Sequence, residues 1–344
     1  MQHSILSVST ALPDHRISQE EALAVVRQVH SGREDLQRLV RVFPNSGVKD
    51  RYFVYPAKAY LQERDFEERN LDYIEQGLNL AERAAKNCLR KAGVAVGDVD
   101  HLLLVTTTGL ATPSLDARLV ERLGLRSDVR RWPLFGLGCA GGAGGLTRAC
   151  DILDGSPDGK ALVVSVELCG QIFSTKATTP ADIIGASLFG DGAAAALVGA
   201  GEGPRIGGRK TVLYDGTEHL MGWSFTSDGM RLVLSREVTD FIGARLKPVI
   251  EAFLLDRGLT QKDVAHWLLH PGGRRIIETY GKSFGLDADA LRWTRSSLER
   301  VGNLSSASIL FILADAFEAG VPGDRGLMVA LGPGFASELL LLEW

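Results

Sequence analysis

One cysteine, Cys139, lies in a glycine turn that leads into a predicted helix. The turn and the first helical residues read Leu134-Phe-Gly-Leu-Gly-Cys139-Ala-Gly-Gly-Ala-Gly-Gly145, and apolar residues then recur at helical spacing at Leu146, Ala149, Cys150 and Leu153. Because glycines lower helix propensity, we expect this helix to be packed tightly on all sides. A thiol at a buried helix N-terminus feels the positive end of the helix dipole, which favours the thiolate. The pattern predicts a nucleophile, and the alternative is a small buried cysteine in a close-packed turn.

His270 and Asn303 are the candidate partners of this cysteine. His270 opens the segment His270-Pro-Gly-Gly273 after a short apolar run, and Asn303 opens the small-residue segment Asn303-Leu-Ser-Ser-Ala-Ser308. Beside Cys139, His270 would stabilise the thiolate as an ion pair. Both side chains donate hydrogen bonds that suit an oxyanion at a thioester carbonyl, and no partner carboxylate for His270 is evident. Taken singly, His270 also fits a strand-end cap and Asn303 a helix N-cap.

The same turn fits a dinucleotide-binding pattern, Gly136-x-Gly138-x-x-Gly141, with Glu167 after a later apolar run. That pattern requires a buried hydrophobic strand before its first glycine. The preceding residues are Arg130-Arg-Trp-Pro133, and proline argues against a central strand. We therefore do not expect a nicotinamide cofactor to bind here.

The segments that position these residues repeat within the chain at an offset of 165 residues. Three pairs match at this offset: residues 93–104 with 258–269, the helix after Cys139 with the helix after Asn303, and residues 161–167 with 326–332. Each half reads as helix, buried strand, helix, buried strand, which predicts βαβ units and a parallel sheet. Each half is then expected to end in two apolar strands around a glycine turn, Gly190-Asp-Gly192 in the first and Gly332-Pro-Gly334 in the second.

The repeat predicts two similar α/β halves, residues 1–205 with Cys139 and residues 206–344 with His270 and Asn303, packed by pseudo-twofold symmetry. Ligand sites in such sheets lie where strands end and helices begin. Pseudo-symmetry then brings Cys139, His270 and Asn303 to the same end of the adjoining sheets.

Composition excludes several function classes. The 344 residues are 45% hydrophobic and 23% charged, which is typical of a globular chain with a deep core. The formal net charge of −4 gives no reason to expect nucleic acid or an anionic membrane as a partner. No run approaches the roughly 18 apolar residues of a membrane span, and the first residues lack the features of a signal peptide. The four cysteines contain no CxxC pair, so they indicate neither zinc nor a disulfide framework, and we expect a reducing, cytoplasmic setting.

Two helices are predicted before the repeat begins. Residues 18–30 have the pattern of a capped helix, and residues 71–92 that of a long helix ending near Gly93. Between the two helices the chain carries five basic residues close together, Arg33, Arg38, Arg41, Lys49 and Arg51. Such a patch suits a phosphate-bearing ligand, but it is also typical of a solvated face.

Four motifs resemble, in order, those of the chalcone and stilbene synthase family, the type III polyketide synthases. They are Gly138-Cys139-x-Gly-Gly, Leu188-Phe-Gly-Asp-Gly-Ala-Ala194, His270-Pro-Gly-Gly273 and Gly302-Asn-Leu-Ser-Ser-Ala307. The resemblance extends from about residue 38 to the C-terminus and is closest to bacterial members. It implies a thiolase-like fold with the layers α-β-α-β-α, a homodimer, and iterative decarboxylative condensation of malonyl-CoA onto an acyl-CoA starter. It implies no cofactor besides these CoA thioesters.

The same resemblance implies roles for individual residues. Cys139 would carry the starter and the growing chain, while His270 and Asn303 would hold the thioester carbonyl of malonyl-CoA and stabilise the enolate left by decarboxylation. Phe189 matches the gatekeeper phenylalanine between the CoA tunnel and the cavity. Further substrate contacts are implied for Thr107 and Ser305, and CoA contacts for Arg38, Arg41 and Gly272.

Departures from the plant enzymes bear on the substrate. Leu232 replaces a second gatekeeper aromatic, Cys169 lies where plant enzymes have a cavity-lining threonine, and Trp223 lies where they have a small residue. The Gly-Phe-Gly-Pro-Gly loop of the family reads Ala330-Leu-Gly-Pro-Gly334. A less aromatic cavity mouth suits an aliphatic starter, because each buried methylene adds about 0.8 kcal/mol, whereas Trp223 fills volume. A fatty acyl starter and a pyrone, resorcinol or phloroglucinol-type product are expected.

Three other functions remain as alternatives. A ketoacyl-carrier-protein synthase, from the related condensing enzymes, shares the Cys-His-Asn set but would present a basic face to its carrier protein. A thioester hydrolase would need His270 as a general base and room for water. A non-catalytic acyl-CoA binder is disfavoured, because all three reactive residues are present.

Overall fold

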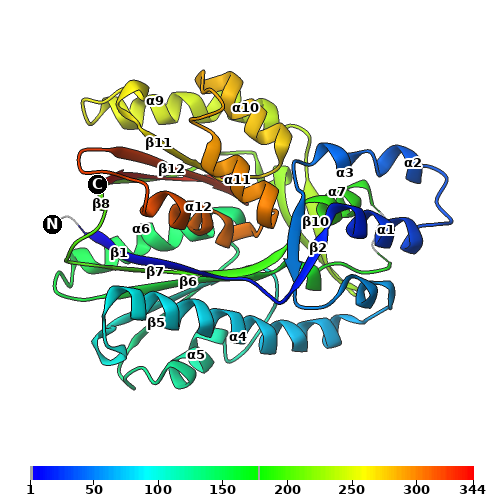
Figure 1. Cartoon of the computed structure of the whole chain (residues 1–344), viewed down its shortest axis with the longest axis horizontal. Helices are drawn as coiled ribbons and strands as arrows, with labels where there is room; N and C mark the ends of the chain where they lie inside the picture. The colour runs from blue at the N-terminus through cyan, green and yellow to red at the C-terminus, as the bar shows by residue number, and fades with distance from the viewer. Residues whose placement is uncertain (1–2, 177–178) are drawn as a thin grey trace.

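Two sheets, one from each half of the chain, are joined edge to edge into one nine-stranded sheet (Figure 1). The computed structural model describes residues 3–176 and 179–344, and the strand order of the joined sheet is β11-β12-β13-β8-β1-β7-β6-β4-β5. One register pair, Ser4 with Arg205, joins β1 to β8. The first half contributes β1 (Ser4–Ala11), β4 (His101–Thr106), β5 (Arg130–Phe135), β6 (Ala161–Leu168) and β7 (Asp191–Gly199). The second contributes β8 (Arg205–Leu213), β11 (His266–Leu269), β12 (Arg325–Gly332) and β13 (Ala336–Glu343).

Each sheet is mixed, and only part of it follows the predicted parallel pattern. β4 pairs in parallel with β5 and β6, and β11 pairs in parallel with β12. The strands β7, β1, β13 and β8 pair antiparallel and close each half. β5 lies at the edge of the sheet, which is where Pro133 is tolerated within a strand.

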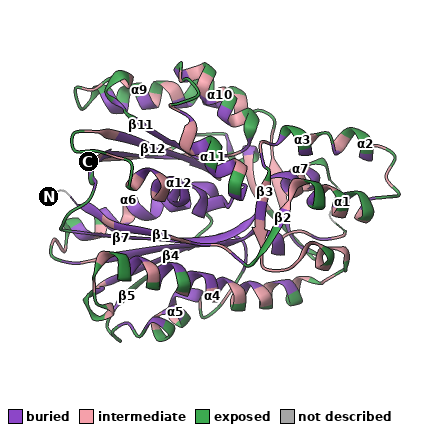
Figure 2. Cartoon of the chain, in the orientation of Figure 1, coloured by how far each residue is buried: buried purple, intermediate pink, exposed green. Residues whose placement is uncertain are grey.

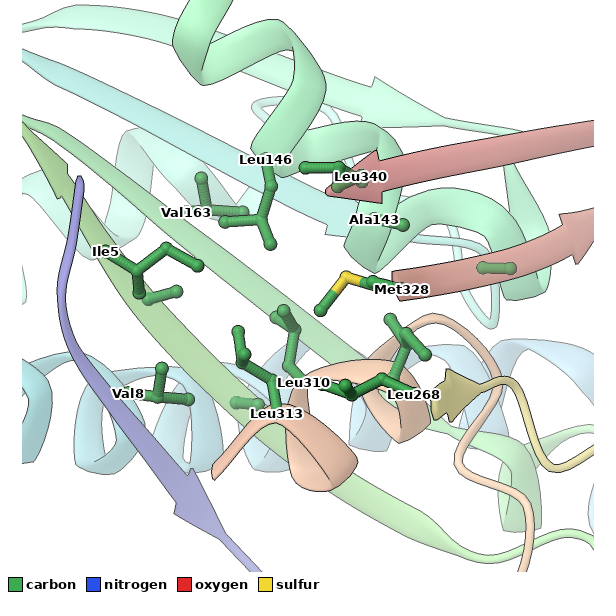
Figure 3. Packing of buried hydrophobic residues seen from close by; sticks show 14 of the residues in the cluster. Ile5, Val8, Ala143, Leu146, Val163, Leu268, Leu310, Leu313, Met328 and Leu340 are labelled. Atoms are coloured by element: carbon green, nitrogen blue, oxygen red, sulfur yellow. The ribbon is translucent and has the colours of Figure 1, made fainter. Parts of the chain in front are cut away.

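Helices and sheets alternate in the five layers α-β-α-β-α that the resemblance implies (Figure 1). One outer layer is α4 (Phe66–Ala92) and α5 (Leu115–Leu123), and the middle layer is α6 (Gly141–Asp154) and α12 (Ser308–Phe317). The other outer layer is α9 (Lys247–Leu255) and α10 (Arg274–Phe284), and α11 (Arg292–Val301) lies beside α12. Burial is deepest in the sheets and the middle layer (Figure 2). Leu146 of α6 and Leu310 of α12 pack there with Val163 and Met328 from the two sheets (Figure 3).

The sequence repeat corresponds to equivalent elements in the two halves. β4 and β11 begin at His101 and His266, which are separated by the predicted 165 residues, and β6 with β12 and α6 with α12 follow the same offset. β5 is the exception, because the same offset from it falls inside α11. The second half therefore has one strand fewer than the first.

The predicted glycine turn between two strands is correct for the second half and wrong for the first. Gly332-Pro-Gly334 joins β12 to β13, but residues 169–190 separate β6 from β7 and contain α7 (Pro180–Leu188). Gly190 marks a close approach of two segments and not a chain reversal, because a Cβ there would lie 2.9 Å from the carbonyl oxygen of Val301. This longer connection carries Phe189 to the second half of the molecule.

The glycines of α6 allow it to contact its neighbours at backbone distance. A Cβ on Gly142 would lie 2.3 Å from the carbonyl oxygen of Ser306, and one on Gly141 would lie 2.5 Å from Cγ1 of Val105. The predicted apolar stripe is fully buried at all four positions, Leu146, Ala149, Cys150 and Leu153. The expected tight packing is therefore confirmed, and it holds the start of α6 against the 3-10 turn η8 (Ser305–Ala307).

A smaller lobe stands at one end of the layers (Figure 1). It contains β2 (His15–Ser18), β3 (Asp50–Phe53), β9 (Met221–Thr226), β10 (Gly229–Leu234), α1 (Gln19–Val29), α2 (Leu36–Leu39), α3 (Val42–Asn45) and α7, and α8 (Val238–Phe241) follows β10.

The two helices predicted before the repeat are present. α1 begins at a capping box formed by Ser18 and Glu21. α4 begins earlier than predicted, at a capping box of Asp65 with Glu68, and ends at Gly93, whose φ is 63°. Among the described helices, none is long and apolar enough to cross a bilayer.

Candidate active site

A cavity of about 1410 Å³, including its open mouth, receives residues from both halves of the chain. Cys139 lines it from the first half, and His270 and Asn303 line it from the second. The exposed fractions of these side chains are 8%, 3% and 3%. The structure therefore brings together the three residues that the sequence singled out, in a concave and largely enclosed space of the kind that binds small ligands.

Cys139 lies in the 3-10 turn η3 (Gly138–Ala140), directly before α6. The turn requires glycine at position 138, because φ is +50° and a Cβ there would lie 2.4 Å from Cδ of Pro333. The Sγ atom lies 3.7 Å from the hydroxyl oxygen of Ser305. Burial raises the pKa of the Cys139 thiol to about 12, and the contact with Ser305 opposes this shift.

His270 follows β11, and its backbone N–H donates to the carbonyl of Val329 in β12 at 2.9 Å. Neither ring nitrogen has a hydrogen-bond partner in the part of the chain that the structure describes. Burial lowers the pKa of the imidazole to about 3, so the ring is neutral, with one nitrogen that donates and one that accepts. Such a ring can accept the proton of a thiol or donate to a bound carbonyl.

Burial opposes the thiolate of Cys139 and the imidazolium of His270 when each is formed alone. Transfer of one proton between them creates both charges inside the same cavity, where opposite charges attract each other more strongly than in water. The predicted ion pair therefore depends on both residues together and not on the helix dipole alone.

Asn303 connects the reactive segments of the two halves. Its backbone N–H donates to the carbonyl of Leu188 at 2.8 Å, and its carbonyl accepts from the N–H of Gly190 at 3.1 Å. Its side-chain Oδ1 accepts from the N–H of Ser305 at 2.9 Å. Because Oδ1 is occupied in this way, Nδ2 is the atom left to donate to a ligand in the cavity. The N-cap prediction for Asn303 is wrong, because Leu304 is the N-cap residue of η8 and Ala307 that of α12. Its Oδ1 holds the turn before η8, and its Nδ2 remains as a donor.

A buried carboxylate, which the sequence did not assign to this region, lies close to the site. Glu167 on β6 accepts from the hydroxyl of Ser306, from the backbone N–H of Thr107 at 3.0 Å and from the hydroxyl of Thr108 at 2.9 Å. Burial raises its pKa to about 7. Its hydrogen bonds tie β6 to η8, and it does not line the cavity, so it is not a partner of His270. Its only sequence signal is an acidic residue at the end of a continuous buried strand.

A second chamber, of about 720 Å³ including its opening to solvent, adjoins the first. Phe189, Trp223 and Leu232 line both chambers, and the rings of Phe189 and Trp223 have centroids 6.3 Å apart. Most other lining residues are apolar, among them Ala22, Val26, Phe53, Ile172 and Phe173. The three shared side chains therefore form the wall between a reactive cavity and an apolar chamber.

The other predicted contacts fall into three groups. Thr107, Ser305 and Gly272 line the reactive cavity, whereas Cys169 lines the second chamber only. Arg38 and Arg41 line neither. Arg38 is exposed on α2 and pairs with Asp35 at 3.4 Å, and Arg41 directly precedes Val42, which lines the cavity.

Sequence reasoning missed three arginines at the lining of the reactive cavity, Arg236, Arg274 and Arg275. Two of them directly follow the His270-Pro-Gly-Gly273 motif, and this position is the signal that was available. Arg274 also pairs with Glu278 at 2.8 Å. Guanidinium groups at the edge of a cavity suit the phosphates of a CoA ester.

Two of the three glycines in the dinucleotide-like pattern, Gly138 and Gly141, serve protein packing, whereas Gly136 adopts a positive φ of 88°. The space next to Gly138 is filled by Pro333, and that next to Gly141 by Val105 and Ser306, so a pyrophosphate has no room there. Within residues 3–176 and 179–344, no group of three or more His, Cys, Asp or Glu side chains is arranged to hold a metal ion.

Models of the chalcone and stilbene synthases match nearly the whole chain, the N-terminal domain over residues 2–202 and the C-terminal domain over residues 208–343. The chain is 38% identical to 1,3,6,8-tetrahydroxynaphthalene synthase from Streptomyces peucetius subsp. caesius, over 99% of this chain and 93% of that protein. It is 32% identical to 3,5-dihydroxyphenylacetyl-CoA synthase from Amycolatopsis balhimycina, over 98% of this chain and 92% of that protein. The crystal structure of 1,3,6,8-tetrahydroxynaphthalene synthase from Streptomyces coelicolor A3(2), a bacterial type III polyketide synthase, matches with a TM-score of 0.95, 30% identity and 99% coverage of both chains.

Alkylation of Cys139 should report whether His270 ionises the thiol. In the wild type we expect the rate with iodoacetamide to be nearly constant between pH 6.5 and 8.5. In His270→Gln no imidazole accepts the thiol proton, and burial still raises the thiol pKa. The rate should therefore fall at least about tenfold at pH 7 and rise about tenfold per pH unit. Mass spectrometry of the modified peptide measures the rate. The Cys139→Ala variant is the control, because it lacks the thiol and should show no modification at this position. A wild-type rate that also rises tenfold per pH unit would contradict the ion pair.

Proposed function

Because the chain belongs to the chalcone and stilbene synthase family, the type III polyketide synthases, we propose that Cys139 carries the acyl starter and the growing chain. The enzyme is an acyltransferase that extends its starter with malonyl-CoA by decarboxylative condensation. One observation supports the residue assignment above all: Cys139, His270 and Asn303 come from different halves and line one buried cavity.

Loading begins with the thiol of Cys139. His270 takes its proton, the thiolate attacks the carbonyl carbon of the acyl-CoA, and the C–S bond to CoA breaks. The proton returns to the leaving CoA thiolate, and the acyl group remains on Cys139 as a thioester. Burial favours this exchange, because it leaves no net charge on either side chain.

Extension uses the two donors of the second half. The N–H of neutral His270 and the Nδ2–H of Asn303 bind the thioester oxygen of malonyl-CoA and stabilise the enolate formed when CO2 leaves. The enolate carbon attacks the acyl carbonyl on Cys139, a C–C bond forms, and the bond from that carbon to Sγ breaks. The extended chain is now on CoA and returns to Cys139 for the next round. The finished chain then cyclises to a pyrone, resorcinol or phloroglucinol-type product.

The starter that fits best is an aliphatic acyl group, and the second chamber supports this choice. It is lined mainly by apolar side chains and adjoins the reactive cavity at Phe189, Trp223 and Leu232. An alkyl chain placed there gains about 0.8 kcal/mol for each methylene removed from water. Trp223 limits how much of the chain can enter, because its ring occupies the wall between the chambers.

The CoA moiety is proposed to lie at the mouth of the reactive cavity. Arg236, Arg274 and Arg275 offer guanidinium groups to its phosphates, with Gly272 close to the thioester and Arg38 and Arg41 farther out. Direct use of CoA esters needs no carrier protein, and no metal or other cofactor enters any of the steps above.

A homodimer is proposed along the edge of β5. Among the described residues, this strand pairs with β4 alone, and it exposes 39% of Trp132 and 49% of Phe135. Leu110, which follows β4, is also 39% exposed. An exposed strand edge with large apolar side chains favours pairing with a second copy. The four cysteines are buried and unpaired, which supports a reducing, cytoplasmic setting.

Incubation of the wild type with labelled malonyl-CoA and a series of acyl-CoA starters should release CO2 and place label in a lengthened, cyclised product. Cys139→Ala should form no detectable product, because the chain has no nucleophile to carry it. Mass spectrometry of the products makes the measurement. Hydrolysis of every ester without extension would favour a thioester hydrolase. Activity only with carrier-protein substrates would favour a ketoacyl-carrier-protein synthase, and the absence of any turnover would favour a non-catalytic binder.

Trp223→Gly should shift the preference among starters toward longer chains. Two more buried methylenes gain about 1.6 kcal/mol, so kcat/KM for the longer ester should rise roughly tenfold relative to the shorter one. Leu232→Phe is the matched opposite change, since it adds volume at the same wall, and should favour shorter starters. Steady-state rates with saturated acyl-CoA esters of increasing length measure both. An unchanged preference in both variants would remove this wall from starter selection.

Trp132→Glu should disrupt the proposed dimer, because it places a charge on an apolar strand edge. Sedimentation should give about twice the chain mass of 37.1 kDa for the wild type and one chain mass for the variant. Leu255→Glu is the control, because Leu255 is 72% exposed at the end of α9, in another outer layer, and its variant should remain dimeric. A dimeric Trp132→Glu protein would contradict this interface.

A further inference from the structure

Arg51 on β3 is a fully buried cation whose hydrogen bonds go to backbone carbonyls. Its Nη1 donates to the carbonyl of Ala186 at 2.6 Å and to that of Phe189 at 3.4 Å, and its Nη2 donates to the carbonyl of Ser187 at 3.0 Å. Burial lowers its pKa to about 9. A buried charge is costly, so these contacts need a specific reason to exist.

The three carbonyls form the C-terminal end of α7. The last carbonyls of a helix have no partner within the helix and carry the negative end of its dipole. α7 does not end in a left-handed glycine, because its cap residue is Phe189 with extended dihedral angles (φ −77°, ψ 151°). The guanidinium of Arg51 therefore takes the place of a helix C-cap, and its planar fork spans carbonyls that a point charge cannot reach together.

The capped segment is bonded directly to Asn303. The carbonyl of Leu188 accepts from the N–H of Asn303 at 2.8 Å, and the N–H of Gly190 donates to the carbonyl of Asn303 at 3.1 Å. The two residues that flank Phe189 in the chain are thus both hydrogen-bonded to Asn303. The Cβ of Arg51 packs on the same junction, 3.2 Å from where a Cβ on Gly190 would lie.

We propose that Arg51 is a positioning residue that fixes, through the end of α7, both the ring of Phe189 and the amide of Asn303. The inference rests on the proposed function, in which Asn303 binds the thioester oxygen of malonyl-CoA. Arg51 belongs to the first half of the chain and Asn303 to the second, so this contact couples the lobe to the reactive cavity. Displacement of the Asn303 amide weakens the hydrogen bond that stabilises the enolate. Displacement of the Phe189 ring changes the length of the chain that the cavity accepts.

The test compares Arg51→Lys with Arg69→Lys. Arg69 is the matched control: it is 5% exposed and likewise donates to backbone carbonyls, none of which is bonded to Asn303. These carbonyls belong to Asp65, Ile172, Phe173 and Asp228. For Arg51→Lys we expect kcat for malonyl-CoA decarboxylation to fall about tenfold to a hundredfold, with KM changed less than about twofold, and the product chain lengths to shift. Arg69→Lys should keep kcat within about twofold. Arg51→Met should lose more activity than Arg51→Lys, since lysine restores part of the hydrogen bonding.

Equal losses of melting temperature in the two lysine variants, with wild-type kcat per folded enzyme, would show a purely structural role and overturn the proposal. If Arg51→Lys does not fold, Gly190→Ala tests the same junction with the guanidinium present. Its methyl would lie 2.9 Å from the carbonyl oxygen of Val301 and 3.2 Å from Cβ of Arg51. We expect its decarboxylation kcat to fall as well, and an unchanged kcat overturns the proposal. A wild type without decarboxylation would instead refute the proposed function itself.

Discussion

The close contact between the start of α6 and η8 is the constraint on which the site depends. A Cβ on Gly142 would lie 2.3 Å from the carbonyl oxygen of Ser306, so only glycine allows this approach. The contact sets the turn of Cys139 beside the segment of Asn303 and Ser305, which lies in the other half of the chain. Because protein interiors are close-packed, a side chain at this crossing would separate the two halves, and with them Cys139 from His270 and Asn303.

Burial then governs the reactivity of the assembled residues. It raises the pKa of Cys139 to about 12 and lowers that of His270 to about 3, so neither side chain ionises alone near neutral pH. The same low-polarity surroundings strengthen any hydrogen bond or ion pair formed with a bound thioester. Glu167 is kept out of this chemistry because its oxygens accept from Thr107, Thr108 and Ser306. Among the described residues that line the cavity, none is Asp or Glu, so in the proposed mechanism the donors of His270 and Asn303 meet the enolate without a competing carboxylate.

The symmetric core and its asymmetric additions have different tasks. The repeated strands and helices bring Cys139, His270 and Asn303 to one place, whereas the chain between β6 and β7 and the lobe form the wall between the two chambers. Arg51 connects these parts, since it caps α7 from the lobe while α7 is bonded to Asn303. A change in the lobe can thus alter substrate choice and enolate stabilisation together, although the core remains the same.

The sequence by itself determined the features that local periodicity, capping and repetition encode. The buried stripe after Cys139, the capping box at Ser18, the 165-residue repeat and the Cys-His-Asn set were all predictable, because each depends on spacing along the chain or on motifs that resemble a known family. Only the tertiary structure decided what a glycine or a charged residue does where the sequence pattern allowed more than one role. The glycines around Asp191 were predicted to reverse the chain and instead allow close approach, since both uses need glycine. Arg51 was one charge in a basic patch until folding buried it against carbonyls more than a hundred residues away in the chain, a contact that no local pattern encodes.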